Sequence, residues 1–359
     1  MADIKQTIKG AVSAIDEWQR HHRTAAVTYA VIKKFGADDS NLLVVGLGWY
    51  GFTAIYPLLL VVITVFGYIG VASLGTGIVN TLHQFPVIGS QFNPGRGGSQ
   101  MHGSVLGLVI GVAGLLYGAQ GVTQIAEKAM ARVWNVPQTR MPGFLPSLGR
   151  SLAGLAAIGG TFLINAVLAP IATGHSIPWY ARILIVAGML LLNCALYLIA
   201  FKVLTPAEVT WRQLVPGSLL AAFGFTILIT VGAGLVQHQL RHSSATYGAF
   251  AAVIGLVTFL LLLAKLTLYA AELNPVLARR LWPRALPTCR PTAADDEHLQ
   301  ALVYEQRRRP DQRIGVRFDP NAPGDAAVSD TASQDDSGRS RETGASARRR
   351  SSTTASRHR

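Results

Sequence analysis

The sequence predicts an all-α polytopic membrane protein with six transmembrane helices. Six apolar segments each exceed the roughly 20 residues that a helix needs to cross about 30 Å of hydrocarbon. Half of the 359 residues are hydrophobic and only 14% are charged, whereas about a quarter would be charged in a soluble domain. The predicted spans are residues 42–69, 103–126, 151–173, 181–203, 213–237 and 247–273.

Lys and Arg alternate between the two sets of connections. Residues 1–41 carry six of them and residues 127–150 carry four, whereas the opposite connections hold Arg96 and Arg241, with Arg182 at an edge. Connections rich in Lys and Arg stay on the cytoplasmic side. We therefore expect a multi-pass protein of the plasma (inner) membrane with both termini in the cytoplasm.

The first 41 residues form a cytoplasmic amphipathic segment. Ile4, Ile8, Val12 and Ile15 recur at helical spacing between charged residues. Such a helix can lie on the membrane surface, or it can pack on the cytoplasmic face of the bundle. The pattern favours neither placement.

Residues 274–359 are predicted to form a cytoplasmic, largely disordered basic tail. Beyond about residue 291 the chain is rich in Ala, Ser, Thr, Asp, Arg and Pro, and such a segment buries too little apolar area to offset its ordering entropy. At most a short helix near 294–309 is expected. Residues 339–359 hold seven Arg and one acid. This end of the tail suits anionic lipid, and nucleic acid is an unlikely partner because no aromatic side chains are interleaved with the arginines.

Motifs near the helix ends resemble a known family. Residues 205–224 read TPAEVTWRQLVPGSLLAAFG, and residues 247–278 read YGAFAAVIGLVTFLLLLAKLTLYAAELNPVLA. Pro57 lies in AIYPLLLVV, and the second span runs into GAQGVTQIAEKAMARVWNVP. Over about residues 20–280 the chain resembles the YihY / virulence-factor BrkB family, and AKLTLYAAELN is most similar to its YhjD-like subgroup. A Trp frequent in the sixth span of that family is replaced here near Phe259.

This resemblance implies a six-span inner-membrane protein whose molecular activity is poorly defined. The subgroup is connected with export of lipid A precursors, and older members carried the name ribonuclease. No nuclease chemistry is predicted here, because Asp38 and Asp39 lack a metal-ligand cluster. His238 and His242 lie four residues apart, but no nearby Asp, Glu or Cys completes a metal site. We therefore expect no enzyme, no metal and no cofactor.

Charged residues inside or near the predicted spans are the candidates for a binding site. Lys265 lies in an apolar run of the sixth span, where it either snorkels to the interface or faces the bundle and binds an anionic headgroup. Glu272, seven residues later on the same helical face, is expected to cap the helix or to pair with Arg279 or Lys128. The candidate anion-binding residues are Lys265, Glu272, Lys128, Arg132 and Arg212.

Small residues and prolines predict how the helices pack. Gly103, Gly107 and Gly111 recur at a spacing of four residues in the second span, and small residues at this spacing let helix backbones approach closely. Pro57 and Pro170 interrupt the first and third spans and are expected to kink them.

Two classes of function follow from these features. The first is a transporter or translocator of an anionic lipid or envelope precursor, with cationic side chains at the cytoplasmic helix ends collecting the headgroup. The second is a non-catalytic membrane scaffold or envelope-integrity protein, in which those charges only set topology. Membrane lipids are the expected partners in both cases, and the sequence is compatible with a homo-oligomer.

Overall fold

The computed structural model describes residues 2–69, 105–137, 139, 143–173, 178–242, 245–287, 289–309 and 311–318. The regular elements within these ranges are all α-helices, as the apolar segments predicted. The predicted exofacial connection 70–102 lies outside the described residues. The helices are α1 (Ala2–His21), α2 (Arg23–Ala37), α3 (Ser40–Ile69), α5 (Val105–Val133), α6 (Phe144–Thr173), α7 (Trp179–Leu204), α8 (Trp211–His242), α9 (Ala245–Arg279) and α10 (Ala293–Glu305).

The six predicted apolar segments coincide in order with α3, α5, α6, α7, α8 and α9. Among the described residues, four helices contain stretches that are long and apolar enough to cross a membrane, and Ser40–Ile55 is a shorter apolar stretch. Several membrane-spanning helices are therefore a property of this chain. The four stretches are Val109–Val133, Trp179–Leu204, Trp211–Ile229 and Val253–Arg279.

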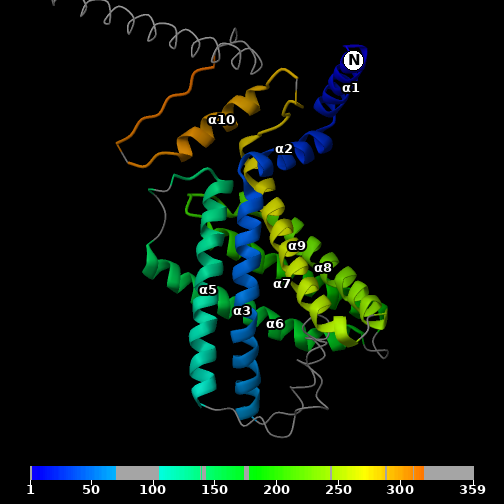
Figure 1. Cartoon of the computed structure of the whole chain (residues 1–359), viewed down its shortest axis with the longest axis vertical. Helices are drawn as coiled ribbons and strands as arrows, with labels where there is room; N and C mark the ends of the chain where they lie inside the picture. Colours follow the sequence, from blue (N-terminus) through cyan, green and yellow to red (C-terminus); the bar gives the residue numbers. More distant parts are fainter. Residues whose placement is uncertain are drawn as a thin grey trace, which may run out of the picture. The chain divides into compact units, whose positions relative to one another are not determined.

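The helix α3 packs along both α5 and α9, and α8 packs against α7 and α9 (Figure 1). Glycine permits the close approach of α5 to α3, because a Cβ added at Gly118 would lie 2.7 Å from Cβ of Ala54. Gly121 faces the ring of Tyr50 in the same way. Close packing through glycines thus occurs in this helix, about two to three turns beyond Gly111.

The structure describes two of the three glycines that were predicted to mediate helix packing. Gly103 lies outside the described residues, whereas Gly107 and Gly111 lie within α5, and Gly111 is buried. The helix α3 continues through Pro57 to Ile69, and α6 continues past Pro170 to Thr173. Neither proline ends its helix.

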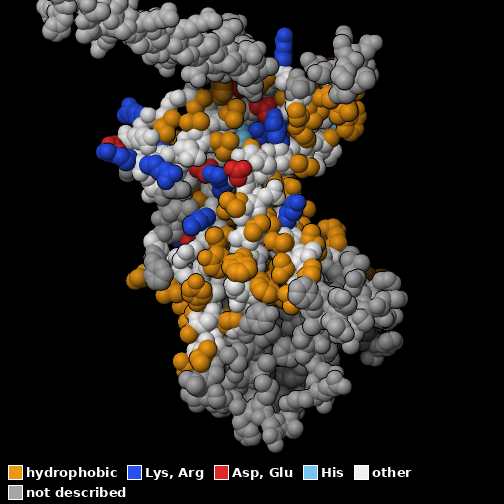
Figure 2. Space-filling view, in the orientation of Figure 1, with side chains coloured by type: hydrophobic (Ala, Val, Ile, Leu, Met, Phe, Trp, Pro, Cys, Tyr) orange, Lys and Arg blue, Asp and Glu red, His pale blue; other side chains and the backbone are white. Residues whose placement is uncertain are grey.

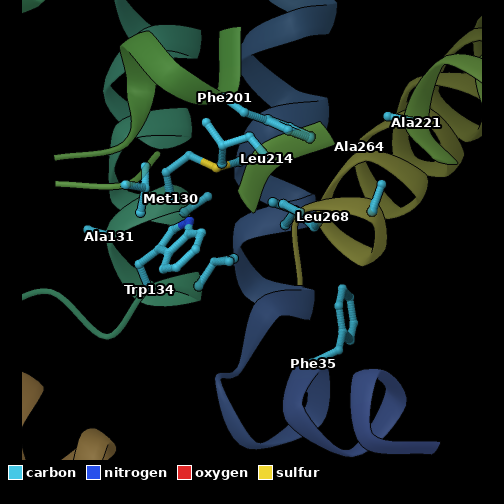
Figure 3. Close-up of a cluster of buried hydrophobic side chains, with 14 of the residues drawn as sticks. Phe35, Met130, Ala131, Trp134, Phe201, Leu214, Ala221, Ala264 and Leu268 are labelled. Carbon is cyan, nitrogen blue, oxygen red and sulfur yellow. The ribbon is translucent and has the colours of Figure 1, made fainter. Parts of the chain in front are cut away.

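One apolar core joins residues of the six helices α2, α3, α5, α7, α8 and α9, and Figure 3 shows part of it. Phe35 of α2 and Leu268 of α9 belong to it, together with Met130 of α5 and Trp134 just beyond that helix. Leu214 near the start of α8 is fully buried in the same cluster. Because this core includes α2, the amphipathic N-terminal segment is an integral part of the bundle rather than a lead attached to it.

The N-terminal helix α1 packs through polar side chains. Gln19 donates from Nε2 to the carbonyl oxygen of Arg284 over 2.6 Å, and Asp16 accepts from the backbone N–H of Leu286 over 2.9 Å. Ile15 and Trp18 remain exposed on its other face. Of the two placements left open by the sequence, packing on the protein holds for Asp16 and Gln19.

The compact unit that contains the helices extends past residue 274, where the predicted tail begins. Residues up to Ile314 belong to one compact unit, and residues from Gly315 onward form a second unit. The helix α10 is capped by Thr292 and buries Ala294 and His298. This helix lies where a short helix near 294–309 was expected, and ion pairs hold it although the segment is poor in apolar residues. Residues 319–359 lie outside the described part.

Candidate functional site

A buried ion cluster lies where α2, α3 and α9 meet. Nζ of Lys34 donates to Oδ2 of Asp38 and, over 2.7 Å, to Oε2 of Glu272. It also donates to the carbonyl oxygen of Val133 over 2.8 Å. Ser40 donates from Oγ to Oε1 of Glu272 over 3.2 Å. All three donor positions of the ammonium group are thus used, and the three charged side chains are fully buried.

The imidazole of His298 in α10 faces this cluster. Its Nε2 lies 3.4 Å from Oδ1 of Asp38, and the residue is fully buried. Burial, followed by repulsion from Lys34 and Arg284, lowers the pKa of His298 to about 3. The ring is therefore neutral at neutral pH and contributes packing rather than charge.

A second group of ionic contacts attaches the start of α10 to α2 and to the segment after α9. Asp295 accepts from Lys33 over 2.8 Å, from Nε of Arg284 over 2.9 Å, and from the backbone N–H of Ala285 over 2.9 Å. Burial alone would raise the pKa of Asp295, but hydrogen bonds from Lys33, Ala285, Thr292 and Arg284 outweigh it and lower that pKa below its usual value. The carboxylate is therefore ionised, and it joins α10 to α2 and to the segment after α9.

The other end of α10 contacts α5. Glu305, the last residue of α10, accepts from Nη1 of Arg132 over 2.7 Å and from Nδ2 of Asn135 over 3.2 Å. Arg132 also donates from Nε to the backbone oxygen of Asp38 over 3.0 Å. Asn135 has a positive φ of 51°, where the chain turns after α5. The carboxylate of Glu305 is therefore held between a guanidinium and an amide.

These contacts border a pocket of about 990 Å³. Its wall combines charged side chains with apolar ones, because Leu42 and Leu43 of α3 line it together with Lys128 and Arg132 of α5. Leu42 is 76% exposed. The lining residues are Gly36, Asp38, Asp39, Asn41, Leu42, Leu43, Gln124, Glu127, Lys128, Ala131, Arg132, Val136, Gly143, Ser147 and Glu305.

The pocket carries more acidic than basic side chains, but most of the acids are already paired. Asp38 is neutralised by Lys34, Glu127 by Arg150 over 2.7 Å, and Glu305 by Arg132. Asp39 is exposed, with Arg132 3.7 Å away. Lys128 is exposed and forms no ion pair with any described residue. The cation left available in the pocket is thus Lys128.

The structure brings together some of the predicted anion-binding residues and separates others. Lys128 and Arg132 line one pocket. Arg212 at the start of α8 and Lys265 within α9 are both exposed and do not line it. Charged side chains gather on the end of the molecule where α2 and α10 lie, and hydrophobic ones prevail on the helices below (Figure 2).

The expected partner of Glu272 was wrong. We predicted helix capping or a pair with Arg279 or Lys128, but Glu272 is bound by Lys34 and Ser40. Arg279 instead donates to the carbonyl oxygen of Trp134 over 2.9 Å. The reason is that α2 folds against the end of α9 and carries its ammonium group into the buried face.

Reasoning from sequence missed Lys34, Asp38, His298 and Glu305 as parts of this region. A local signal existed for the first two, because Lys34 and Asp38 are four residues apart on a helix that also carries the core residue Phe35. No comparable signal marks His298 and Glu305, which lie in a segment of low apolar content. Within the described ranges no group of three or more His, Cys, Asp or Glu residues could hold a metal ion.

Comparison with known proteins gives one match. The family model described as Virulence factor BrkB matches residues 31–294, which include α3 to α9 and the start of α10. No curated protein and no solved structure matches the chain. The matched region contains the ion cluster residues from Lys34 to Glu272 but ends before Asp295, His298 and Glu305.

Proposed function

The chain belongs to the Virulence factor BrkB family of membrane proteins, and on that premise we propose that it is a transporter or translocator of an anionic lipid or envelope precursor in the inner membrane. It has no enzymatic role in this proposal, and it uses no cofactor. The anionic headgroup binds in the pocket between α3, α5 and α10. The cation Lys128, unpaired among the described residues, and the apolar wall of the pocket both support this substrate class.

The proposal rests on the position of two cations, Lys128 and Arg132, in the same pocket as exposed leucine. The two cations lie four residues apart, so they lie on one face of α5, and both line the pocket. Leu42 and Leu43 line the same pocket from α3. A lipid has an anionic headgroup beside an apolar chain, and this wall offers a complement to each part.

The proposal includes the topology. All six apolar helices cross the membrane, and both termini are cytoplasmic, because Lys and Arg are concentrated at that set of connections. The pocket then opens at the cytoplasmic ends of α3 and α5, where a precursor made inside the cell would arrive. Lys128 and Arg132 attract anionic headgroups at this surface, where basic residues are favoured.

A second candidate is a non-catalytic scaffold for the envelope. The observation that favours it is the position of Lys265 and Arg212, which are exposed and do not converge on the pocket. In that case the cations set topology, and the pocket is a surface feature. The two functions differ in one measurable respect, namely whether the purified chain moves lipid.

The test is lipid translocation by the full chain in proteoliposomes. Fluorescent phosphatidylglycerol and fluorescent phosphatidylcholine are compared, with dithionite quenching as the readout of movement between leaflets. Faster movement of phosphatidylglycerol is expected, and the double variant Lys128→Gln, Arg132→Gln should lose most of this preference. Arg280→Gln, which removes an exposed cation outside the pocket, serves as the control. Equal rates with and without the protein would overturn translocation in favour of the scaffold.

A further inference from the structure

The carboxylate of Glu305 lies in the pocket proposed for the anionic headgroup. Its Oε1 accepts from Arg132 over 2.7 Å and its Oε2 accepts from Asn135 over 3.2 Å, so the two donors bind the two oxygens separately. Only about 9% of the side chain is exposed. A guanidinium and an amide set to receive two oxygens of one anion are the donors expected at a carboxylate or phosphate site.

The position of Glu305 is not explained by α10 itself. An acidic residue at the C-terminal end of a helix is disfavoured by the helix dipole, which makes that end negative. The helix carries its favourable acids at the other end, where Asp295 and Asp296 lie in the first turn. Glu305 is therefore held at its position by Arg132 and Asn135, which belong to α5 and the turn after it.

Lys128 completes the arrangement. It lies one turn before Arg132 on α5, lines the same pocket as Glu305, and has no ion-pair partner among the described residues. The pocket thus holds one cation already satisfied by a carboxylate of the same chain and a second cation that is open. An incoming headgroup can reach Lys128 directly, whereas Nη1 of Arg132 becomes available to it when Glu305 leaves.

The geometry points to Glu305 as an intramolecular competitor of the anionic ligand: its carboxylate occupies the donors of Arg132 and Asn135, and Lys128 is a further cation of the same pocket. This inference rests on the proposed function and names the regulation of its site. The first turn of α10 is fastened separately through Asp295 to Lys33 and Arg284. Glu305 can therefore leave the site while α10 stays attached at its start. The ligand chemistry is an oxyanion, either a lipid phosphate or free phosphate.

The experiment measures equilibrium binding to the full chain in phosphatidylcholine nanodiscs. The probes are a fluorescent short-chain phosphatidylglycerol, its phosphatidylcholine counterpart, and inorganic phosphate as an unlabelled competitor. Glu305→Gln removes the charge and keeps the shape, and it should bind phosphatidylglycerol at least about fivefold more tightly than the unaltered chain, since a charge-assisted competitor is weakened. Glu297→Gln, an exposed acid of the same helix outside the pocket, should change nothing.

Two further variants make the outcome decisive. Glu305→Ala should give the same gain if Glu305→Gln folds poorly, and adding Arg132→Gln to Glu305→Gln should abolish the gain. Competition by inorganic phosphate would identify the headgroup phosphate as sufficient, and lack of competition would mean that the lipid chain is also required. Both results support the competitor.

Different results overturn the competitor and the proposed function. Unchanged affinity in Glu305→Gln and Glu305→Ala, with phosphatidylglycerol still preferred over phosphatidylcholine, would reject Glu305 as a competitor and leave the proposed function standing. Absence of any preference for phosphatidylglycerol in all variants would reject the anion-binding function itself.

Discussion

The helix α7 and the junction of α2, α9 and α10 distribute polarity in opposite ways. In α7 the side chains are exposed or half-buried except for Phe201 near the end of the helix, and Leu184 and Leu191 are 74% and 67% exposed. At the junction Lys34, Asp38 and Glu272 are fully buried. In lipid the hydrophobic effect does not drive helices together. The comparison therefore teaches that apolar surface can be left outward in this chain, while the charges that are buried at the junction are paired with one another.

The largest loss of stability is expected when the buried ion cluster loses its cation. Lys34→Met keeps the side-chain volume but leaves two carboxylates, Asp38 and Glu272, without their cation. Removing one partner of a buried ion pair costs roughly 3–5 kcal/mol. Thermal unfolding of the purified protein in detergent should report this loss.

The matched control for that change is the neighbouring lysine. Lys33 is 31% exposed, and its partner Asp295 keeps Arg284. Lys33→Met should therefore cost about 1 kcal/mol or less. Equal losses in the two variants would mean that burial does not distinguish the two ion pairs.

The next effect concerns the apolar surface of α7. Leu191 lies near the middle of the helix and is largely exposed. If that surface faces lipid, Leu191→Lys should disfavour insertion by roughly 2.5–3.5 kcal/mol, since a charge at the centre of a span carries this cost. Membrane-insertion efficiency measured with a glycosylation reporter would reveal it.

Leu191→Ala provides the contrast for this surface. It removes exposed apolar atoms without adding charge, so insertion should change by less than about 1 kcal/mol. Normal insertion of Leu191→Lys would show that this face of α7 is not in contact with lipid.

A smaller effect is expected from pH at the junction. Because the pKa of His298 is lowered to about 3 in the folded protein, the unfolded chain binds more protons between about pH 3 and 6.5, and stability falls as pH drops through that window. Between pH 6.5 and 5 the loss is about 2 kcal/mol. Unfolding measured at pH 7 and pH 5 should show this loss in the unaltered chain.

The variant His298→Gln separates this titration from general acid sensitivity. Glutamine does not titrate, so the difference in stability between pH 7 and pH 5 should shrink by about the same 2 kcal/mol. The lowered pKa of Asp295 acts at a lower pH, because its stabilisation is present above the unfolded value and is lost as pH falls toward the folded one. An unchanged pH difference in His298→Gln would contradict the neutral buried imidazole.

The smallest effect is expected at Lys265. It is exposed on α9 and does not line the pocket, so Lys265→Ala should keep most of the preference for phosphatidylglycerol in the translocation assay. Arg212→Gln should behave likewise. Loss of translocation by Lys265→Ala at normal expression would restore the interpretation in which this residue faces the pathway and binds the headgroup.

The sequence by itself determined the helical class, the order of the apolar helices and the family. These properties depend on composition and on runs of about 20 or more apolar residues, and such runs are local. It also singled out Lys128 and Arg132, which line one pocket, because cations at helix ends stand out in an apolar chain. The proposal that all six helices cross the membrane is based on the length of the apolar segments and on the alternation of Lys and Arg.

Only the tertiary structure decided which charges are paired. Lys34 and Glu272 are 238 residues apart in the chain, and their pairing depends on α2 folding against the end of α9. Glu305 reaches Arg132 across 173 residues from the end of a short helix for which the sequence predicted no partner. Ion pairs between distant residues leave no periodic pattern in the sequence, because the packing of the helix ends determines which charged residues meet. That packing is a property of the whole bundle, so the buried cluster and the occupied pocket became visible only in three dimensions.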